Sequence, residues 1–330
     1  MVPKISVITT VFNCERYIRQ SLESILNQTF RDFEYIVVND GSTDNTLQKI
    51  REIASADDRI ILIDNKTNIG RVKSLNTALE NVKSSYIAIQ DADDISLPER
   101  LEKQYNFLEN NKDYVLAGAN IIVMDEFENF ISKPERPIEN DEAKFSLLFR
   151  CTFANPSIMF RKKVIDENNI KYEDNFIHAE DFRIITLISR HGKVYNLKEP
   201  LVKYRKHSFN NSMVNFDILN SGSIIIVKEN LAGLGIDAGG EQIYRIRNLI
   251  SSRGINKNFL YEDLKLLLKA IKAYREKCST VKNREILLTL RRMLNWIGRK
   301  NVTTKLKYQK LYLVVFSYYL KETLINRKLQ

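Results

Sequence analysis

The 330-residue sequence has only three cysteines and no long hydrophobic run. Cys14, Cys151 and Cys278 are far apart and odd in number, so they form neither a disulfide framework nor a metal-ligand spacing. The longest apolar run, Leu311–Leu320, is interrupted by Ser317 and is too short to span a bilayer. The chain begins directly with a strand pattern and shows no signal peptide. We therefore expect a cytoplasmic protein without a transmembrane anchor.

Two glycine-rich motifs that bind nucleotides are missing as well. The sequence contains neither the Gly-x-Gly-x-x-Gly fingerprint of dinucleotide-binding domains nor a phosphate-binding loop that ends in Gly-Lys-Ser or Gly-Lys-Thr. These absences count against a dehydrogenase and against a P-loop enzyme.

The net charge of +10 is distributed unevenly. Residues 1–240 carry 30 Lys and Arg against 35 Asp and Glu, a net charge of −5, whereas residues 241–330 carry 21 against 6, a net charge of +15. A basic segment of this kind indicates contact with an anionic partner. Leucine-rich amphipathic stretches near 259–277, 284–299 and 305–325 predict that this part is helical.

The first 125 residues alternate between strand and helix patterns. The expected strands are near-continuous apolar runs, typical of a parallel sheet covered on both faces, at Ile5–Val11, Phe33–Asn39, Ile60–Asp64, Tyr86–Gln90 and Tyr114–Val123. Amphipathic stretches lie between them, near Glu15–Gln28, Thr43–Ala56, Arg71–Val82 and Pro98–Glu109. The alternation predicts a doubly wound, mostly parallel α/β domain that binds ligands at the carboxyl ends of its strands.

The pattern is looser after residue 125. We expect helices at Asp141–Phe149 and Ala179–His191, and strands at Pro156–Phe160, Val194–Leu197 and Leu201–Tyr204. Beyond about residue 215 the chain is predicted to be wholly helical. The sequence thus indicates an α/β domain over 1–215, with halves 1–125 and 126–215, followed by a basic helical extension over 216–330.

An acidic turn follows the predicted strand Tyr86–Gln90. Asp91, Asp93 and Asp94 place three carboxylates within four residues, and uncompensated charge at the edge of a core is costly. Hard oxygen ligands at this spacing suit Mg²⁺ or Mn²⁺, which bind through one or two carboxylates together with substrate phosphates. The alternative is an ordinary acidic turn in which Asp94 caps the helix that begins near Pro98.

Two further polar turns are expected at the same edge of the sheet. Asp40 precedes Gly41, which permits a tight turn, and the carboxylate can accept hydrogen bonds from a nucleobase or a ribose. Arg71 opens a helix after Asn68 and Gly70, and it can stack on a base or reach a phosphate. Taken alone, the Asp40 turn is equally typical of a turn with a helix cap, and a lone arginine such as Arg71 is more often a solvated surface residue. Their convergence on one edge favours a binding site.

These motifs, in this order and at these intervals, resemble the family 2 glycosyltransferases, which adopt the GT-A fold. The resemblance covers residues 3–212 and rests on Val11-Phe-Asn13, Val38-Asn-Asp40-Gly-Ser-Thr-Asp44, Asn68-Ile-Gly-Arg71, Asp91-Ala-Asp93-Asp94, Asn155-Pro-Ser-Ile-Met-Phe-Arg161, Ala179-Glu180-Asp181 and Tyr204-Arg205-Lys206-His207. It implies that residues 1–125 bind the nucleotide-sugar and that residues 126–215 form the acceptor half.

The resemblance also implies a donor site for a nucleotide-sugar, most often a UDP-sugar, with a divalent cation, Mn²⁺ or Mg²⁺. Asp40 would bind the base and Asp91 the ribose. Asp93 would hold the cation that bridges the two phosphates, with Asp94 as a second ligand or an orienting residue. Such a cation neutralises charge on the departing diphosphate. The other donor-binding positions would be Thr10, Val11, Phe12, Asn13, Arg71, Ala92, Arg205 and His207, and His207 is also a candidate metal ligand.

Asp181 matches the position of the family's catalytic base, and Glu180 is its rival. A carboxylate with a pKa near its ordinary value of about 4 is a weak base in water, so its usefulness would come from positioning. The alternative is that both residues complement the dipole of a helix. Asn155 stands where the family often has histidine, which leaves an acceptor contact at this position open.

Several other interpretations compete with this one. A sugar-1-phosphate nucleotidyltransferase shares the nucleotide-binding architecture, but Val11–Glu15 lacks the glycine and arginine residues of a triphosphate loop. A processive polysaccharide synthase would carry Gln-x-x-Arg-Trp, whereas Trp296 follows Arg292-Met-Leu-Asn295. The basic segment 241–330 would suit an anionic membrane surface, oligomerisation or plain packing, and less well a nucleic acid.

The sequence therefore predicts a metal-dependent, inverting, non-processive glycosyltransferase of the bacterial surface-polysaccharide type. It would transfer a hexosyl or N-acetylhexosaminyl group from a UDP-sugar to a hydroxyl of a glycan or lipid-linked acceptor. We expect it in the cytoplasm, or peripherally at the inner face of the cell membrane.

Overall fold

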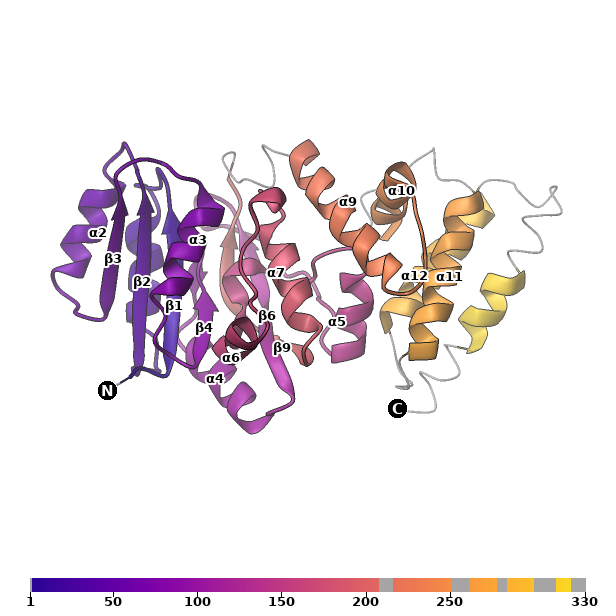
Figure 1. Ribbon diagram of the computed structural model, residues 1–330, viewed down its shortest axis with the longest axis horizontal. Coiled ribbons are helices and arrows are strands. Elements are labelled where there is room, and N and C mark those ends of the chain that lie inside the picture. Colours follow the sequence, from indigo (N-terminus) through magenta and orange to yellow (C-terminus); the bar gives the residue numbers. More distant parts are fainter. Residues whose placement is uncertain (1, 208–215, 251–260, 278–283, 300–312, 322–330) are drawn as a thin grey trace. The chain divides into compact units, whose positions relative to one another are not determined.

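The computed structural model describes residues 2–207, 216–250, 261–277, 284–299 and 313–321 (Figure 1). The chain forms two compact units. Unit 1 consists of residues 1–138 and 153–219, and unit 2 of residues 139–152 and 220–330. The predicted stretch 305–325 is described only at 313–321, where it is helical, and its remaining residues lie outside the described part of the chain.

The N-terminal half of unit 1 is a parallel sheet in the order β3-β2-β1-β4. Every residue of β1 and β2 is buried, because helices cover both faces of an apolar strand pair. The bounds of these strands are Ile5–Val11 (β1), Phe33–Asp40 (β2), Ile60–Asn65 (β3) and Tyr86–Ile89 (β4), and those of the connecting helices are Ile18–Leu26 (α1), Thr46–Ala54 (α2) and Arg71–Glu80 (α3). All four strands lie where the sequence predicts them, so their carboxyl ends share one edge.

The sheet continues through strands of both directions, in the order β4-β8-β6-β9-β5, with β7 paired to β6. The strands are β5 (Ile95–Ser96), β6 (Tyr114–Met124), β7 (Phe130–Ser132), β8 (Met159–Arg161) and β9 (Lys193–Arg205). β8 runs antiparallel to β4 and β6, whereas β9 runs parallel to β6. The helices and 3₁₀ turns here are α4 (Arg100–Asn110), η1 (Asn155–Ser157), α6 (Lys162–Glu167), η2 (Asp174–Phe176) and α7 (Glu180–Ser189).

β9 differs from the sequence prediction, which divides it into two strands. The pairing of β6 with β9 shifts register near Asn120, opposite Pro200. A proline cannot donate to the ladder, so the strand accommodates it at an irregularity instead of ending there. The continuous strand carries the chain from Lys193 to Arg205, at the edge of the acidic turn.

A buried arginine fixes the chain around that turn. The Arg100 side chain is fully buried and donates hydrogen bonds to the Gln90 Oε1 atom at 2.9 Å, the Ser96 Oγ atom at 2.8 Å and the Ile89 carbonyl at 2.7 Å. Burial lowers the pKa of Arg100 to about 10. Because these partners flank residues 91–95, the network holds both sides of the acidic turn.

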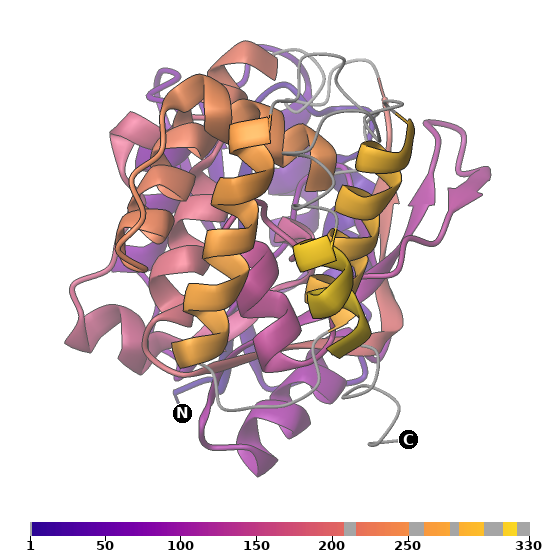
Figure 2. The ribbon, with the colours of Figure 1, turned by 90° about the vertical axis from the view of Figure 1, so that its right-hand side faces the viewer.

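Unit 2 is helical (Figure 2). Its helices are α5 (Asn140–Leu147), most of α9 (Phe216–Ala232), α10 (Gly240–Ile250), α11 (Tyr261–Lys277), α12 (Arg284–Arg299) and the helix at 313–321. Arg245 on α10 pairs with the buried Asp263 on α11 at 2.7 Å. Among the residues that the structure describes, none of the helices has the length and hydrophobicity that a bilayer crossing requires.

The segment 139–152 belongs to the same compact unit as these C-terminal helices, whereas the sequence pattern places it in the predicted acceptor half, 126–215. Glu285 of α12 contacts Arg150 at 3.1 Å and Ser146 at 3.3 Å, and Tyr274 of α11 donates to the Asp141 carbonyl at 2.9 Å. These contacts join residues more than 130 positions apart, which periodicity along the chain does not reveal.

Candidate active site

A cavity of about 820 Å³ opens in unit 1 at the carboxyl ends of β1, β2 and β4. This is the edge at which the sequence places its polar turns. The lining comes from five segments of the chain: Thr10–Cys14, Asp40, Asn68–Lys73, Ala92–Asp93 and Asp174–Glu180, with His207 in addition. Of the predicted donor-binding positions, only Asp91 and Arg205 are not part of the lining.

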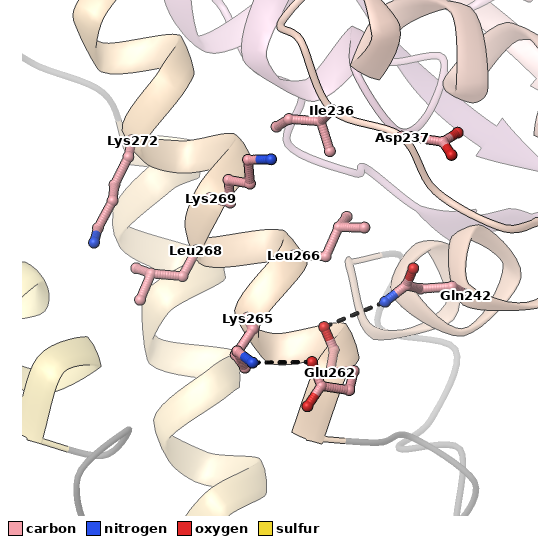
Figure 3. Close-up of a pocket in the computed structure, with 9 residues that line it drawn as sticks. All are labelled: Ile236, Asp237, Gln242, Glu262, Lys265, Leu266, Leu268, Lys269 and Lys272. Carbon is pink, nitrogen blue, oxygen red and sulfur yellow. Dashed lines mark hydrogen bonds and ion pairs between the residues drawn. The ribbon is translucent and has the colours of Figure 1, made fainter.

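A second cavity, of about 450 Å³, lies in unit 2 beside α11 (Figure 3). Lys265, Lys269 and Lys272 line it together with Asp237 and Glu262, and the Lys265 ammonium pairs with Glu262 at 3.1 Å. Cations and carboxylates thus alternate around it, and its remaining lining is largely aliphatic. The groups that suit nucleotide-sugar chemistry converge instead on the cavity of unit 1.

Asp40 braces the loop that begins α3. Its carboxylate accepts the backbone N–H groups of Ile69 at 2.9 Å and Gly70 at 3.0 Å, and the Asn65 side chain at 3.1 Å. Only 3% of Asp40 is exposed, at the wall of the cavity. The next residue, Gly41, has φ +69°, and a Cβ atom there would lie 2.4 Å from the Thr67 carbonyl carbon. The chain therefore needs glycine at this close approach.

Arg71 joins the acidic turn to the first turn of α7. Its guanidinium contacts Asp91 Oδ1 at 2.7 Å and Glu180 Oε1 at 2.9 Å. Burial opposes the positive charge, but Asp91 and then Glu180 outweigh it and raise the pKa of Arg71 above its usual range. Asn155 also donates to Asp91 Oδ1, at 2.8 Å. The residue expected to flank a base thus lines the cavity while it bridges two carboxylates, and its contact with a base stays a prediction.

Asp93 and His207, 114 positions apart, meet at the cavity. The Asp93 Oδ2 atom lies 2.8 Å from the His207 Nε2 atom, and the imidazole ring packs 5.1 Å from the ring of Tyr17. Both are positions at which the resemblance implies a metal ligand. Arg205, another expected donor-binding position, is 2% exposed and donates to the Asp93 carbonyl at 2.9 Å and to the Gln20 side chain at 2.6 Å, and its contact with the donor stays a prediction. It positions the turn from behind.

Asp94 is tied to β9. Its Oδ1 atom accepts the backbone N–H of Arg205 at 2.7 Å, and only 1% of the residue is exposed. Its Oδ2 atom is buried and has no hydrogen-bond partner among the described residues. Burial, then the charges of Asp93 and Asp91, raise the pKa of Asp94 well above its ordinary value. Asp94 does not line the cavity, and its role as a second metal ligand stays a prediction.

Glu180 and Asp181 open α7 and have different surroundings. Glu180 lines the cavity, its Oε1 atom is held by Arg71, and its Oε2 atom is buried without a hydrogen-bond partner among the described residues. Asp181 accepts the backbone N–H of Phe182 at 2.6 Å. Burial and then the charge of Glu180 raise the pKa of Asp181 to about 7. A carboxylate that titrates near neutral pH suits general-base catalysis.

Several residues that line the cavity are not among those predicted from the sequence. Ile69 and Ile177 are 40% and 53% exposed and add apolar wall beside Phe12, which is 47% exposed. The other missed residues are Cys14, Asn68, Gly70, Val72, Lys73, Asp174 and His178. The missed residues at 68–73 flank Arg71 and those at 174–178 precede Glu180, so extending each motif by a few residues would have included them. Burial, then the charge of Asp93, raise the pKa of Cys14 to about 12, so its thiol is unreactive at neutral pH.

A pair of side chains at the cavity wall can hold a metal ion. No group of three or more His, Cys, Asp or Glu residues suited to a metal occurs in the part of the chain that the structure describes. Asp93 and His207 supply one carboxylate and one imidazole at the cavity wall. Mg²⁺ and Mn²⁺ sites in phosphoryl enzymes commonly complete their coordination with substrate oxygens and water, so this pair fits such an ion.

Comparison with known proteins identifies the family. Residues 6–168 match the family model described as Glycosyl transferase family 2. An uncharacterized glycosyltransferase of Haemophilus influenzae is 34% identical over 275 residues, which span 79% of this chain and 85% of the relative. The chain belongs to glycosyltransferase family 2.

Two further proteins extend the comparison. The O-antigen biosynthesis glycosyltransferase WbnJ of Escherichia coli is 35% identical over 209 residues, covering 62% of this chain and 80% of WbnJ. The crystal structure of S. aureus TarS residues 1–349 in complex with UDP-GlcNAc superposes with a TM-score of 0.59 at 20% identity, covering 96% of this chain and 91% of that one. The predicted GT-A fold with its helical C-terminal part is confirmed, and this chain is a glycosyltransferase.

Proposed function

We propose that this glycosyltransferase moves a hexosyl or N-acetylhexosaminyl group from a UDP-sugar to a hydroxyl of a glycan or lipid-linked acceptor, with inversion at the anomeric carbon. The observation that carries the proposal is the convergence of Asp40, Asp93, Glu180 and His207 on one cavity, with Arg71 bridging its two sides. The UDP-GlcNAc complex of TarS and the O-antigen role in the name of WbnJ support the choice of donor and acceptor classes.

The donor half of the site recognises the nucleotide. The Phe12 ring and the backbone of Thr10 and Val11 form a wall for the base, and Asp40 offers carboxylate oxygens beside them. Asp91 contacts Arg71 at 2.7 Å next to the lining residues Ala92 and Asp93, and it would accept a ribose hydroxyl. Asp93 and His207 would hold the divalent cation, which when bound supplies positive charge to the departing diphosphate.

The bond-making step requires a base on the acceptor side. The acceptor oxygen attacks the anomeric carbon and the bond from that carbon to the diphosphate oxygen breaks, with its electron pair leaving on the nucleoside diphosphate. Asp181 takes the proton from the acceptor hydroxyl. The raised pKa, about 7, makes Asp181 a stronger base than an ordinary carboxylate and still leaves it largely ionised just above neutral pH. Arg71 holds the Oε1 atom of Glu180 at 2.9 Å, and Glu180 is the alternative base on the cavity wall.

Donor binding provides the direct test. Nucleotide-sugars with uridine, guanosine and other bases are titrated by calorimetry with Mn²⁺ and with a chelator, and we expect a UDP-sugar to bind at least about tenfold more tightly with Mn²⁺. Asp93→Ala should abolish the metal dependence. The matched control is Asp174→Ala, which removes an exposed carboxylate from the same cavity and should preserve it.

The outcomes separate the alternatives. Absence of binding by every nucleotide-sugar, or metal-dependent binding that survives Asp93→Ala, would refute the proposal. Release of pyrophosphate from UTP and a sugar phosphate would reassign the chain to nucleotidyl transfer. Retention at the anomeric carbon, measured by NMR of the product, would refute the inverting mechanism and with it the role of Asp181.

A further inference from the structure

The helix at 313–321 turns its apolar side outward. Leu313, Phe316 and Leu320 are 65%, 38% and 45% exposed, and their spacing of three and four positions puts them on one face. Val315, on the opposite face, is fully buried. Figure 2 shows this helix, the yellow one, on the side of unit 2 that faces the viewer. A helix at a protein surface normally has the reverse orientation, with its apolar stripe facing the core.

The helix contacts α11 of unit 2. Val315 is buried, and the Lys272 ammonium of α11 lies 5.2 Å from the centre of the Tyr318 ring. A helix of nine residues is marginal in water without tertiary packing. Because the outward face contains two leucines and a phenylalanine, its exposure is unfavourable unless another apolar surface covers it.

Lysines lie on this helix and on the neighbouring helix α11. Lys321 ends the helix and is exposed, and Lys265, Lys269 and Lys272 are exposed along neighbouring α11 (Figure 3). The sequence from 241 to 330 carries a net charge of +15. A second copy of the chain would bring the same excess positive charge against this surface, which opposes self-association. The phosphates of a nucleic acid would pair with the lysines but would leave the apolar side chains exposed to water.

An anionic bilayer suits both the apolar face and the lysines, because apolar side chains can insert among the lipid tails while lysines pair with anionic headgroups. We propose that unit 2 docks on an anionic lipid surface through the helix 313–321, with Leu313, Phe316 and Leu320 inserted at the interface and the lysines of α11 on the headgroups. This inference concerns unit 2 and does not depend on the reaction proposed for unit 1.

Vesicle sedimentation of the full chain tests the proposal. Vesicles of phosphatidylcholine alone are compared with vesicles that also contain phosphatidylglycerol. We expect binding only to the anionic vesicles, with an affinity that falls as salt is raised. The triple variant Leu313→Gln, Phe316→Gln and Leu320→Gln should lose at least about tenfold in affinity, because all three side chains lose their apolar insertion.

A matched control separates the helix from general surface hydrophobicity. Phe127 and Phe130 in unit 1 are 71% and 69% exposed, more than any residue of the stripe, and Glu126 and Glu128 lie beside them. The double variant Phe127→Gln and Phe130→Gln should bind anionic vesicles as the wild type does. Lys269→Glu with Lys321→Glu should weaken binding at least about tenfold at low salt, since each Lys near an anionic surface contributes about 1 kcal/mol.

The contrary results are equally specific. Equal vesicle binding by the triple variant and the wild type, or no binding by the wild type, overturns the proposal. A dimer in light scattering that only the triple variant disrupts, with vesicle binding unchanged, assigns the stripe to a second copy. Binding of RNA in place of vesicles, retained by the triple variant, assigns the lysines to nucleic acid. Circular dichroism and UDP-sugar binding verify that each variant is folded.

Discussion

Replacing Asp181 with asparagine should stabilise unit 1 and abolish sugar transfer. Burial and the charge of Glu180 hold the pKa of Asp181 at about 7 in the folded chain, against an ordinary value of 3.8. Between these two pH values the folded state binds a proton that the unfolded state has lost. The free energy of unfolding therefore falls as pH rises from about 4 to about 7, and the loss is complete above pH 7.

The size of the effect follows from the difference in pKa. At about 1.4 kcal/mol per pH unit, a rise from 3.8 to about 7 corresponds to about 4 kcal/mol at most. The asparagine side chain of the variant would carry no charge to desolvate, and its oxygen can still accept the Phe182 N–H, which lies 2.6 Å from Asp181 Oδ1. The variant should thus match the wild type below pH 4 and exceed it by up to about 4 kcal/mol at pH 8.

Urea unfolding followed by hydrogen exchange of peptides from β1 and β2 measures the stability of unit 1 separately from unit 2. A stability difference between Asp181→Asn and wild type that is the same at pH 4 and at pH 8 would refute the reasoning. For catalysis, the wild-type kcat/KM should fall below pH 7 with the protonation of Asp181. Glu180→Gln should move this acidic limb to lower pH because it removes a repelling charge. An unmoved limb would show that Glu180 does not set the ionisation of Asp181.

Three further predictions concern the frame of the site. Arg71→Lys should lower kcat/KM about 10- to 100-fold, because one ammonium cannot span Asp91 and Glu180 as the guanidinium does; near wild-type kinetics would contradict this. Gly41→Ala should lower the free energy of unfolding by about 2–4 kcal/mol, because φ is +69° and the new Cβ atom would lie 2.4 Å from the Thr67 carbonyl carbon. Thermal melts measure the change, and an unchanged melting temperature would contradict the prediction. Arg100→Met should lower the free energy of unfolding by about 3 kcal/mol, because it leaves buried acceptors such as the Ile89 carbonyl unpaired. The control Arg51→Met removes a side chain that is 61% exposed and should change the free energy of unfolding by less than about 0.5 kcal/mol. Equal effects of the two substitutions would contradict a stabilising role for the Arg100 hydrogen bonds.

The strands and the edge that they share could be predicted from the sequence because the signal is local. Apolar runs bounded by polar turns identify β1, β2, β3 and β4, and parallel strands must end at a common edge. The two-residue strand β5 and the three-residue β7 were not predicted. Strands this short form through pairing with distant partners, and their own residues carry too little periodicity to reveal them.

The sequence by itself determined the family, the parallel half of the sheet and several of the charged residues that line one cavity, among them Asp40, Arg71, Asp93 and Glu180, because each of these depends on residue types in short motifs. Only the tertiary structure decided how those charges are paired. It placed Arg71 between Asp91 and Glu180, brought His207 to Asp93 across 114 positions, buried Arg205 behind the acidic turn and tied Asp94 to β9. The physical reason is that ionisation and pairing depend on burial and on distances of a few ångströms, which the folding of remote segments sets.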